Sequence, residues 1–394
     1  MTQLNITIDS DQIQTLIAQC AANELAKNVL TTVFNQIMEQ QRTEYIKAND
    51  YERCDSRQSS RNGYYNRDFT TRIGRLELRV PRTRDGNFSP TIFEQYQRNE
   101  KALLITMMEM FIQGVSTRKV SKAVEALCGE TVSKSFVSNL SKQLDPIVEQ
   151  WRYRSLKDMS YPFLIVDVLY LKIREAERVI SMSCHIAIGV SDSGRREIIG
   201  LYLSKSETAN TWADFFNYLK ERDLSRPKYV ISDAHPGLVQ AIRQCFTGST
   251  WQRCQAHFLR NIFDSMPKKT EKHIKDEIKA IFHMSSVESA RELKNIFIKK
   301  YESNPKLSKA CEILDDGFED AIQILQLPEN IQRRLKTTNC LERLNEEIRR
   351  RERVIRIFPN QASAIRIIGA LLMDKNEEWL STNKKYLDFD PAVI

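Results

Sequence analysis

The sequence predicts a mixed α/β protein in which a sheet-containing core is interrupted by an all-helical insertion and preceded by a mostly helical region. Three observations lead to this fold class. From Tyr161 onwards, apolar runs follow the order of three strands, then helix, strand, helix, strand and helix. Residues 267–335 keep only helical periodicity, and the 394 residues suffice for two or three domains.

Composition indicates an anionic partner. The chain has 59 Lys and Arg against 51 Asp and Glu, a net charge of +8, which favours polyanions and above all nucleic acid. No apolar run approaches the roughly 20 residues that a membrane span needs, and no signal-peptide pattern is present. The eight cysteines form no close C-x-x-C pair, which is typical of reduced thiols. We therefore expect a cytoplasmic protein without a membrane partner.

Residues 1–50 form a predicted helical segment, because apolar side chains recur at helical spacing there. Residues 51–99 are rich in arginine, and the alternation within 69–81 predicts a β-hairpin that turns near Gly74. The positive charge of this hairpin and linker makes it a candidate DNA-binding element. Its candidate contacts are Arg61, Arg67 and Arg72.

Residues 100–150 have the pattern of a helix-turn-helix domain. A helix near 100–113 precedes a closely spaced pair at 117–128 and 133–143, in which Ser133 is a suitable N-cap. The predicted outward side chains of the last helix are Lys134, Ser135, Ser138, Asn139 and Lys142. A DNA-reading helix presents such a set, although an ordinary helical hairpin with a solvated face explains the pattern equally well.

The core begins within residues 158–266. Strands are predicted at 162–173, 178–190 and 196–204, joined by short turns as an antiparallel meander. A helix at about 208–221 follows, with Trp212, Phe215, Phe216 and Leu219 on its apolar face. A strand ending at Asp233, a helix at 237–246, a strand at 250–254 and a helix to about 264 complete this part.

The helical insertion spans 267–335, where Ser285 to Glu288 has the pattern of a capping box. The rest of the core, 336–394, contains a strongly basic helix that ends at Phe358-Pro-Asn360 and a final amphipathic helix at about 361–380.

Three acids stand out. Asp167 lies within an apolar strand, where a lone carboxylate needs a metal ion, hydrogen bonds or a cation. Asp233 ends a later strand and Glu342 lies near the start of the basic helix. Each acid alone is weak evidence for a metal site, since Asp233 could cap a helix and Glu342 could be a solvated helix residue. Jointly their order is the layout of RNase H-like nucleotidyl transferases, and we expect strand geometry alone to fix the site.

Carboxylate oxygens suit Mg²⁺, with Mn²⁺ as a substitute, and Mg²⁺ keeps several waters, so few protein ligands suffice. Two such ions serve phosphodiester cleavage and transfer by activating the attacking oxygen and stabilising the leaving one. We expect Asp167 to bridge both ions, with Asp233 and Glu342 each holding one.

Several blocks of the chain resemble the mutator-type transposases of bacterial insertion sequences. They include Ser232-Asp-Ala-His-Pro-Gly-Leu238, Trp251-Gln-Arg-Cys-Gln-Ala-His-Phe-Leu-Arg-Asn261 and Thr337-Thr-Asn-Cys-Leu-Glu-Arg-Leu-Asn345. The resemblance covers nearly the whole chain, in order. It implies that the three acids are a catalytic DDE triad in an RNase H-like domain. It also implies Mg²⁺-dependent cleavage and transfer of DNA strands at terminal inverted repeats and into target DNA. The protein would act in the bacterial cytoplasm, at the nucleoid, as a homodimer or larger assembly.

Three further residues belong to this expected active site. Cys254 and His257 follow the same family pattern; alone they are half of a tetrahedral zinc site, so we expect a structural or hydrogen-bonding role instead. His235 is expected near the substrate, or else is a turn residue. Glu346 shares a helix face with Glu342, and only the family resemblance selects Glu342.

Arginines continue along the same helix, and we expect Arg343, Arg349, Arg350 and Arg353 to contact phosphates. A charge run is more often a solvated face. Two other functions fit the sequence. One is a protein that only binds DNA, either a repressor of its own element or a derivative with a spent active site, and the other is a nuclease of RNase H type that acts on RNA hybrids or junctions. Intact acids argue against the first, and the separate helix-turn-helix argues against the second.

Overall fold

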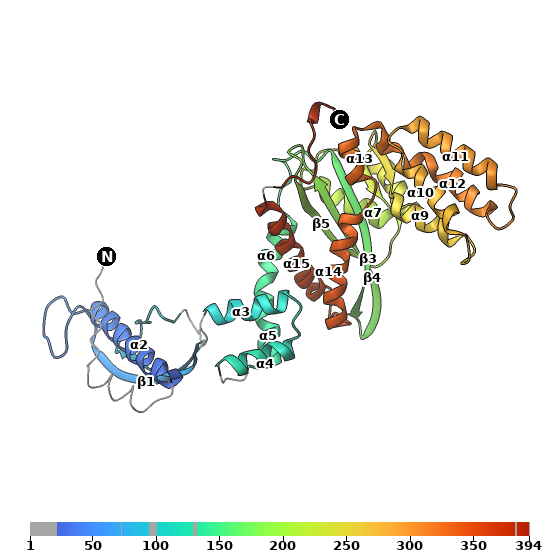
Figure 1. Cartoon of the computed structure of the whole chain (residues 1–394). Helices are drawn as coiled ribbons and strands as arrows, with labels where there is room; N and C mark the ends of the chain where they lie inside the picture. Colours follow the sequence, from blue (N-terminus) through green and yellow to red (C-terminus); the bar gives the residue numbers. More distant parts are fainter. Residues whose placement is uncertain (1–21, 72, 94–100, 129–131, 383, 394) are drawn as a thin grey trace. The chain divides into compact units, whose positions relative to one another are not determined.

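The computed structural model describes residues 22–71, 73–93, 101–128, 132–382 and 384–393. The chain divides into two compact units, Met1–Lys142 and Gln143–Ile394, which we call the N-terminal and C-terminal units. Figure 1 shows their elements. The mixed α/β class predicted from the sequence is confirmed.

The first part of the N-terminal unit is a helix packed on a β-hairpin: α2 (Ala22–Ile46), β1 (Arg61–Thr71) and β2 (Gly74–Thr83). The strands pair antiparallel, with Phe69 opposite Leu76 and Thr71 opposite Gly74. Met38 of α2 shares a core with Leu76 and Leu78. The predicted hairpin is confirmed, although β1 begins at Arg61, well before the alternating residues that revealed it.

Three helices follow in the N-terminal unit: α3 (Lys101–Ile112), α4 (Thr117–Cys128) and α5 (Lys134–Ser141). Leu103 and Met107 of α3, Val124 of α4 and Leu140 of α5 pack in one core. Ser133 is the N-cap of α5 as predicted and accepts a hydrogen bond from a backbone N–H in its first turn. Residues 129–131, in the segment that joins the predicted helices 117–128 and 133–143, lie outside the described residues.

The C-terminal unit is built on a five-stranded sheet with the order β5-β4-β3-β6-β7. Its strands are β3 (Phe163–Glu175), β4 (Arg178–Val190), β5 (Arg196–Ser204), β6 (Tyr229–Ser232) and β7 (Thr250–Arg253). The first three form the predicted antiparallel meander, while β6 runs parallel to β3 and β7 parallel to β6. Ala176 and Glu177 have positive φ angles, which suits the two-residue turn between β3 and β4.

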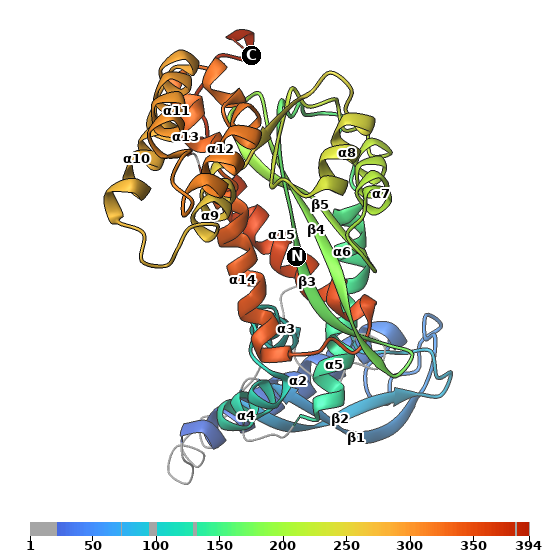
Figure 2. The same ribbon diagram turned by 90° about the vertical axis from the view of Figure 1, so that its right-hand side faces the viewer.

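Helices cover both faces of this sheet (Figure 2). One face carries α7 (Ala209–Lys220) and α8 (Pro236–Cys245), whose buried side chains share a core with Leu164 and Val166 of β3. Beside the other face lie α14 (Asn339–Ile355) and α15 (Gln361–Ser381), and α6 (Asp145–Arg152) packs against α15 at the β5 edge. Alternate residues of a strand point to opposite faces, so Asp167 faces away from Leu164 and Val166.

The predicted insertion is helical throughout. It consists of α10 (Lys272–His283), α11 (Val287–Tyr301), α12 (Ser308–Ala321) and α13 (Glu329–Leu335), after α9 (Gln255–Asp264). The N-cap of α11 is Ser286, which accepts from the backbone N–H of Ser289 at 3.2 Å. The capping box predicted from Ser285 to Glu288 is therefore wrong: the N-cap lies one residue later, and the residue three positions after it is Ser289 rather than a glutamate.

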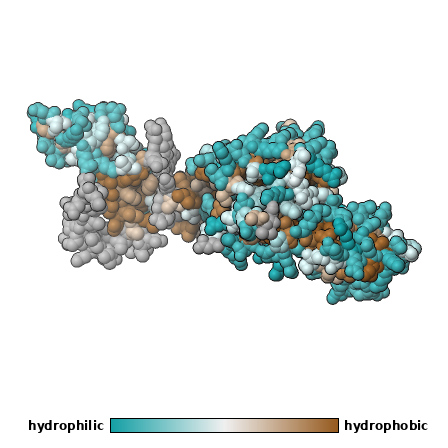
Figure 3. Space-filling view, turned by 90° about the horizontal axis from the view of Figure 1, so that it is seen from above, coloured by the Kyte–Doolittle hydropathy of each residue, from teal (hydrophilic) through white to brown (hydrophobic). Residues whose placement is uncertain are grey.

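The surface of the C-terminal unit is polar. Hydrophilic residues cover most of its visible face in the space-filling view (Figure 3). In the described part of the chain, no helix has the length and apolar character needed to cross a membrane.

Candidate active site

Asp167 lies on the face of β3 that meets α14. Its neighbours on that face, Ile165 and Leu169, are buried. One carboxylate oxygen accepts from the backbone N–H of Val168 at 2.9 Å and the other from Nδ2 of Asn345, on α14, at 2.8 Å. Burial raises the pKa of Asp167 to about 6, against the lowering effect of the Val168 hydrogen bond. The strand thus holds a carboxyl group that is costly to ionise.

Asp233 follows directly after β6, the parallel neighbour of β3. Ile165 lies opposite Ile231 in this pairing, so continuing the register by two residues brings Asp167 level with Asp233. Neighbouring strands are about 4.8 Å apart. Burial raises the pKa of Asp233, and the pKa of Asp167 rises further because Asp233 is negatively charged. The structure therefore brings these two predicted acids together.

Glu342 lies in the first turn of α14. Its Oε1 is 3.2 Å from Nε2 of His257 and 3.8 Å from Nη2 of Arg260, both on α9. The positive charge of His257 also opposes the rise in the pKa of Asp167 and of Asp233. His257 therefore pairs with Glu342 and acts on both aspartates through its charge, and Glu342 is oriented towards α9.

Cys254 and His257 form a buried link between α9 and the start of α14. The Cys254 Sγ accepts from the backbone N–H of Thr338 and lies 3.3 Å from its hydroxyl. Burial alone would raise the pKa of the Cys254 thiol, but His257 and Thr338 outweigh it and lower that pKa. Interaction with Cys254, reinforced by the acids, raises the pKa of His257 to about 9. His257 is therefore a cation at neutral pH.

The sequence did not identify a fourth carboxylate beside the site. Glu207 accepts from the Tyr170 hydroxyl at 2.6 Å and from Nε1 of Trp212 at 3.2 Å, and its side chain is only 8% exposed. Its Oε1 lies 3.4 Å from Nδ1 of His235, the N-cap of α8. The charge of Glu207 contributes to the raised pKa of Asp233. Glu207 could not be found from the sequence, because it does not lie in an apolar run as Asp167 does. Asn345 could have been found, because it is a polar residue one turn after Glu342.

Oxygen donors dominate the site, which suits Mg²⁺ better than zinc. Asp167 and Asp233 form no ion pair among the described residues, so both carboxylates are available as oxygen ligands for a divalent cation. Glu342 is turned to His257 and Arg260. Across the described ranges, no three His, Cys, Asp or Glu side chains are grouped closely enough to bind a metal ion. In this arrangement two aspartates lie level on neighbouring strands, and Glu342 would have to turn to join them as a metal ligand.

The predicted DNA contacts of the N-terminal unit differ in their surroundings. All five outward residues predicted on α5 are exposed, namely Lys134, Ser135, Ser138, Asn139 and Lys142. Arg61 is held within the unit by Asp50 at 2.7 Å and the Thr43 hydroxyl at 3.0 Å. The Arg67 guanidinium lies 4.2 Å from the ring centroid of Phe93. Arg72 lies outside the described residues.

The predicted phosphate contacts on α14, Arg343, Arg349, Arg350 and Arg353, are exposed. Two of them also pair along the helix, Arg349 with Glu352 at 4.0 Å and Arg350 with Glu347 at 3.7 Å. Exposed pairs of this kind are weak, so both guanidinium groups remain accessible to a phosphate.

Comparison with known proteins identifies the family. The family model described as "Transposase, Mutator family" matches residues 1–382, and the chain belongs to this family. It is 58% identical over 390 residues to the transposase for insertion sequence element IS256 in transposon Tn4001 of Staphylococcus aureus, covering 99% of this chain and 100% of that protein. It is 39% identical over 365 residues to the transposase for ISRM5 of Rhizobium meliloti, covering 92% and 90%. The transposase for IS1081 of Mycobacterium tuberculosis is 35% identical over 389 residues, covering 97% and 92%.

Proposed function

We propose that this chain is an insertion-sequence transposase that binds terminal inverted repeats and catalyses Mg²⁺-dependent cleavage and transfer of DNA strands. The observation that carries the proposal is that Asp233 is level with Asp167 on paired strands, while His257 pairs with Glu342 and acts on both aspartates through its charge, in a member of the Mutator family. The sheet order β5-β4-β3-β6-β7, with an acid in its central strand, supports an RNase H-like core.

The three acids would hold the metal ions. Bound Mg²⁺ supplies positive charge that activates the attacking oxygen and stabilises the charge that develops on the phosphate. Asn345 and the Val168 N–H orient the two oxygens of Asp167. His257, a cation at neutral pH, offsets the negative charge of the acids while Glu342 is turned towards it.

Arginine side chains near the acids explain how DNA would reach the site. Arg260 lies at the edge of the acid cluster, 3.8 Å from Glu342, where a guanidinium group can bind a phosphate oxygen. The exposed arginines along α14 extend the positive surface from there. We infer that the phosphodiester backbone follows α14.

Recognition of the element ends is assigned to the N-terminal unit. The exposed face of α5 presents lysine, serine and asparagine side chains, which can hydrogen-bond to base edges in the major groove. The exposed arginines of the hairpin would add contacts to phosphates. Because two element ends are joined in one reaction, we infer at least a homodimer on DNA, acting at the bacterial nucleoid.

The catalytic proposal is tested with purified protein and a duplex that carries the terminal repeat of its element. We expect strand cleavage in Mg²⁺ or Mn²⁺ and none in EDTA. Asp167→Asn, Asp233→Asn and Glu342→Gln should bind the duplex but leave it uncut. Glu347→Gln, on the same helix as Glu342, is the matched control and should cleave. Cleavage by Glu342→Gln would remove that residue from the triad.

Recognition by α5 is tested by Lys134→Ala and Asn139→Ala. Each is expected to cost about 1–3 kcal/mol of discrimination between the terminal repeat and random DNA. Lys122→Ala removes an exposed lysine of α4 and should leave the discrimination intact. Equal discrimination by all three variants would show that α5 does not read the bases.

A further inference from the structure

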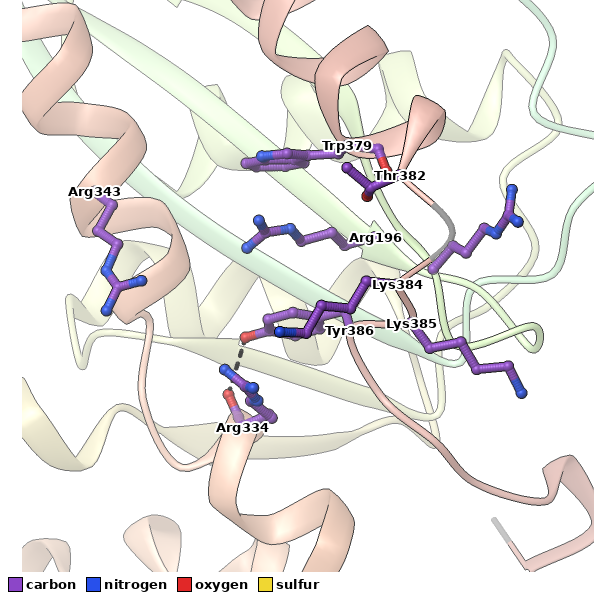
Figure 4. A pocket seen from close by; sticks show the side chains of 9 residues that line it. Arg196, Arg334, Arg343, Trp379, Thr382, Lys384, Lys385 and Tyr386 are labelled. Carbon is purple, nitrogen blue, oxygen red and sulfur yellow. Dashed lines mark hydrogen bonds between the residues drawn. The ribbon is translucent and has the colours of Figure 1, made fainter.

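A second polar site lies in the C-terminal unit, separate from the contacts of Glu342 with α9. It is a pocket of about 190 Å³, and none of the described residues that line it is acidic. Its walls come from the start of β5, the end of α13, the first turns of α14, the end of α15 and the segment after it (Figure 4). The cationic lining residues are Arg195, Arg196, Arg334, Arg343, Lys384 and Lys385.

Aromatic rings hold the central cation in place. The Arg196 guanidinium is 3.9 Å from the ring centroid of Trp379 and 5.1 Å from that of Tyr386, and Figure 4 shows it between these two rings. The Tyr386 hydroxyl donates to the backbone carbonyl of Arg334 at 3.2 Å. Cation–π contacts on two sides fix the direction of the guanidinium before any ligand arrives.

The pocket concentrates like charges around Arg196. Burial lowers the pKa of Arg196, and the positive charges of Arg334 and Arg343 lower it further. Among the described residues, the ion pair at the pocket is the one between Lys385 and Asp388, at 3.2 Å. Gathering guanidinium groups in this way is unfavourable unless an anion relieves their repulsion. The geometry and the charge together define an anion site.

We propose that this pocket binds a phosphate of the DNA backbone close to the phosphodiester that the three acids act on. A volume of about 190 Å³ is below the roughly 300–1,000 Å³ typical of sites for drug-sized ligands, so it suits a phosphate rather than a nucleoside. Arg196 already lies against both aromatic rings, so they are not free to stack a base. Guanidinium groups match phosphate oxygens through paired hydrogen bonds.

Helix α14 connects this pocket to the acid site. Glu342 contacts α9, while Arg343, the next residue, lines the pocket. Consecutive Cα atoms are about 3.8 Å apart, and a DNA strand places one phosphate per roughly 3.4 Å of helix axis. A strand at the acids therefore has a phosphate within a few nucleotides that reaches the pocket. This assignment rests on the proposed function, because it takes DNA as the substrate.

The test compares two neighbouring arginines of α13. Arg334→Gln removes a pocket cation, while Arg333→Gln removes an exposed arginine that does not line the pocket. Both change the net charge equally. Affinity for a short duplex of random sequence is measured by fluorescence anisotropy over a range of salt concentrations. We expect Arg334→Gln to lower the slope of log K against log salt by about 1, the loss of one phosphate contact, and Arg333→Gln to keep the wild-type slope.

Equal slopes for the two variants would overturn the pocket assignment. Inorganic phosphate provides a second arm: if it raises the Tm of the wild type but not of Arg334→Gln while the DNA slopes stay equal, the pocket binds a free anion and the DNA assignment is wrong. Cleavage of the terminal repeat by the wild type is scored separately. If the wild type cleaves the repeat and the two variants have equal salt slopes, only the pocket assignment is refuted. If the wild type does not cleave and Arg334→Gln has a lower salt slope, only the proposed transposase chemistry is refuted.

Discussion

Replacing Asp167 by Asn is expected to stabilise the metal-free C-terminal unit at neutral pH while removing strand cleavage. Burial holds the pKa of Asp167 at about 6 in the folded protein, against 3.8 for an ordinary aspartate. A carboxyl group whose pKa is raised by folding binds its proton more tightly in the folded state. Its stabilising contribution is therefore complete below about pH 4 and is lost as the pH rises through about 6.

The size of the effect follows from this pKa difference. Each pKa unit corresponds to about 1.36 kcal/mol, so ionised Asp167 destabilises the folded state by at most about 3 kcal/mol at pH 7.5. Solvent contact of the partly buried carboxylate makes this an upper limit. The Asn side chain keeps one oxygen to accept from the Val168 N–H. Its amide would face Asn345, whose buried Oδ1 has no hydrogen-bond partner, so rotation of the Asn345 amide restores the second hydrogen bond.

Tryptophan fluorescence measures this unit alone, because Trp151, Trp212, Trp251 and Trp379 are the four tryptophans of the chain and all lie in the C-terminal unit. Urea unfolding in EDTA should give a higher midpoint for Asp167→Asn than for the wild type at pH 7.5. The difference in unfolding free energy between the two proteins should fall below about 1 kcal/mol near pH 4. Asp192→Asn, which changes an exposed carboxylate, is the control. A midpoint at or below that of the wild type at pH 7.5, or a gap independent of pH, would refute the reasoning.

Three other substitutions test neighbouring contacts. Asn345→Ala removes the hydrogen bond to Asp167, worth about 1.5–3 kcal/mol for a charged acceptor, so single-turnover cleavage should slow by roughly 10- to 150-fold while DNA binding persists; an unchanged rate would contradict this role. Cys254→Ala removes the largest cause of the high pKa of His257, so an NMR titration should place that pKa below about 9, and an unshifted titration would exclude the thiol as its cause. Gly200→Ala places a Cβ 2.8 Å from a core phenyl ring, so urea unfolding should show that the free energy of unfolding falls by about 1–3 kcal/mol. An unaltered midpoint would mean that the core side chains rearrange to accommodate the methyl group.

Most elements could be predicted because their residues carry the pattern themselves. The helix α7 shows its buried face in the spacing of Trp212, Phe215 and Phe216, and the structure buries all three. The first half of β1 carries no such pattern. Its Tyr65 and Arg67 become strand residues by pairing with Val80 and Leu78 of β2, so the partner strand determines this part of the hairpin.

The surroundings of the acids depend on contacts between residues far apart in the chain, which local patterns do not contain. Asn345 reaches Asp167 only because α14 returns to β3 after the whole insertion. Glu207 becomes part of the site only because Trp212 and Tyr170 bind its carboxylate beside Asp233. Periodicity identifies which residues face inward, but it does not identify which inward residues meet.

The expectation that strand geometry alone fixes the site holds for two acids only. Asp167 and Asp233 are positioned by the pairing of β3 with β6, but Glu342 enters from a helix beyond the insertion. Hydrogen bonds at the junction of β7 and α9 hold the far end of that insertion. Its far end is held where the backbone N–H of Gln255 donates to the Lys336 carbonyl at 2.9 Å.

The last helical turns before that end are held in the same way, since Gln252 of β7 donates to the Ala321 carbonyl at 2.8 Å and accepts from the backbone N–H of Ile324 at 2.8 Å. Cys254 completes the junction through its contacts with Thr338, four residues before Glu342. The start of α14 is therefore anchored to the strand next to β6. The pairing of β3 with β6 positions the two aspartates, and this anchor holds the helix that carries Glu342 against α9, which explains how the chain accommodates a helical insertion between the second acid and the third.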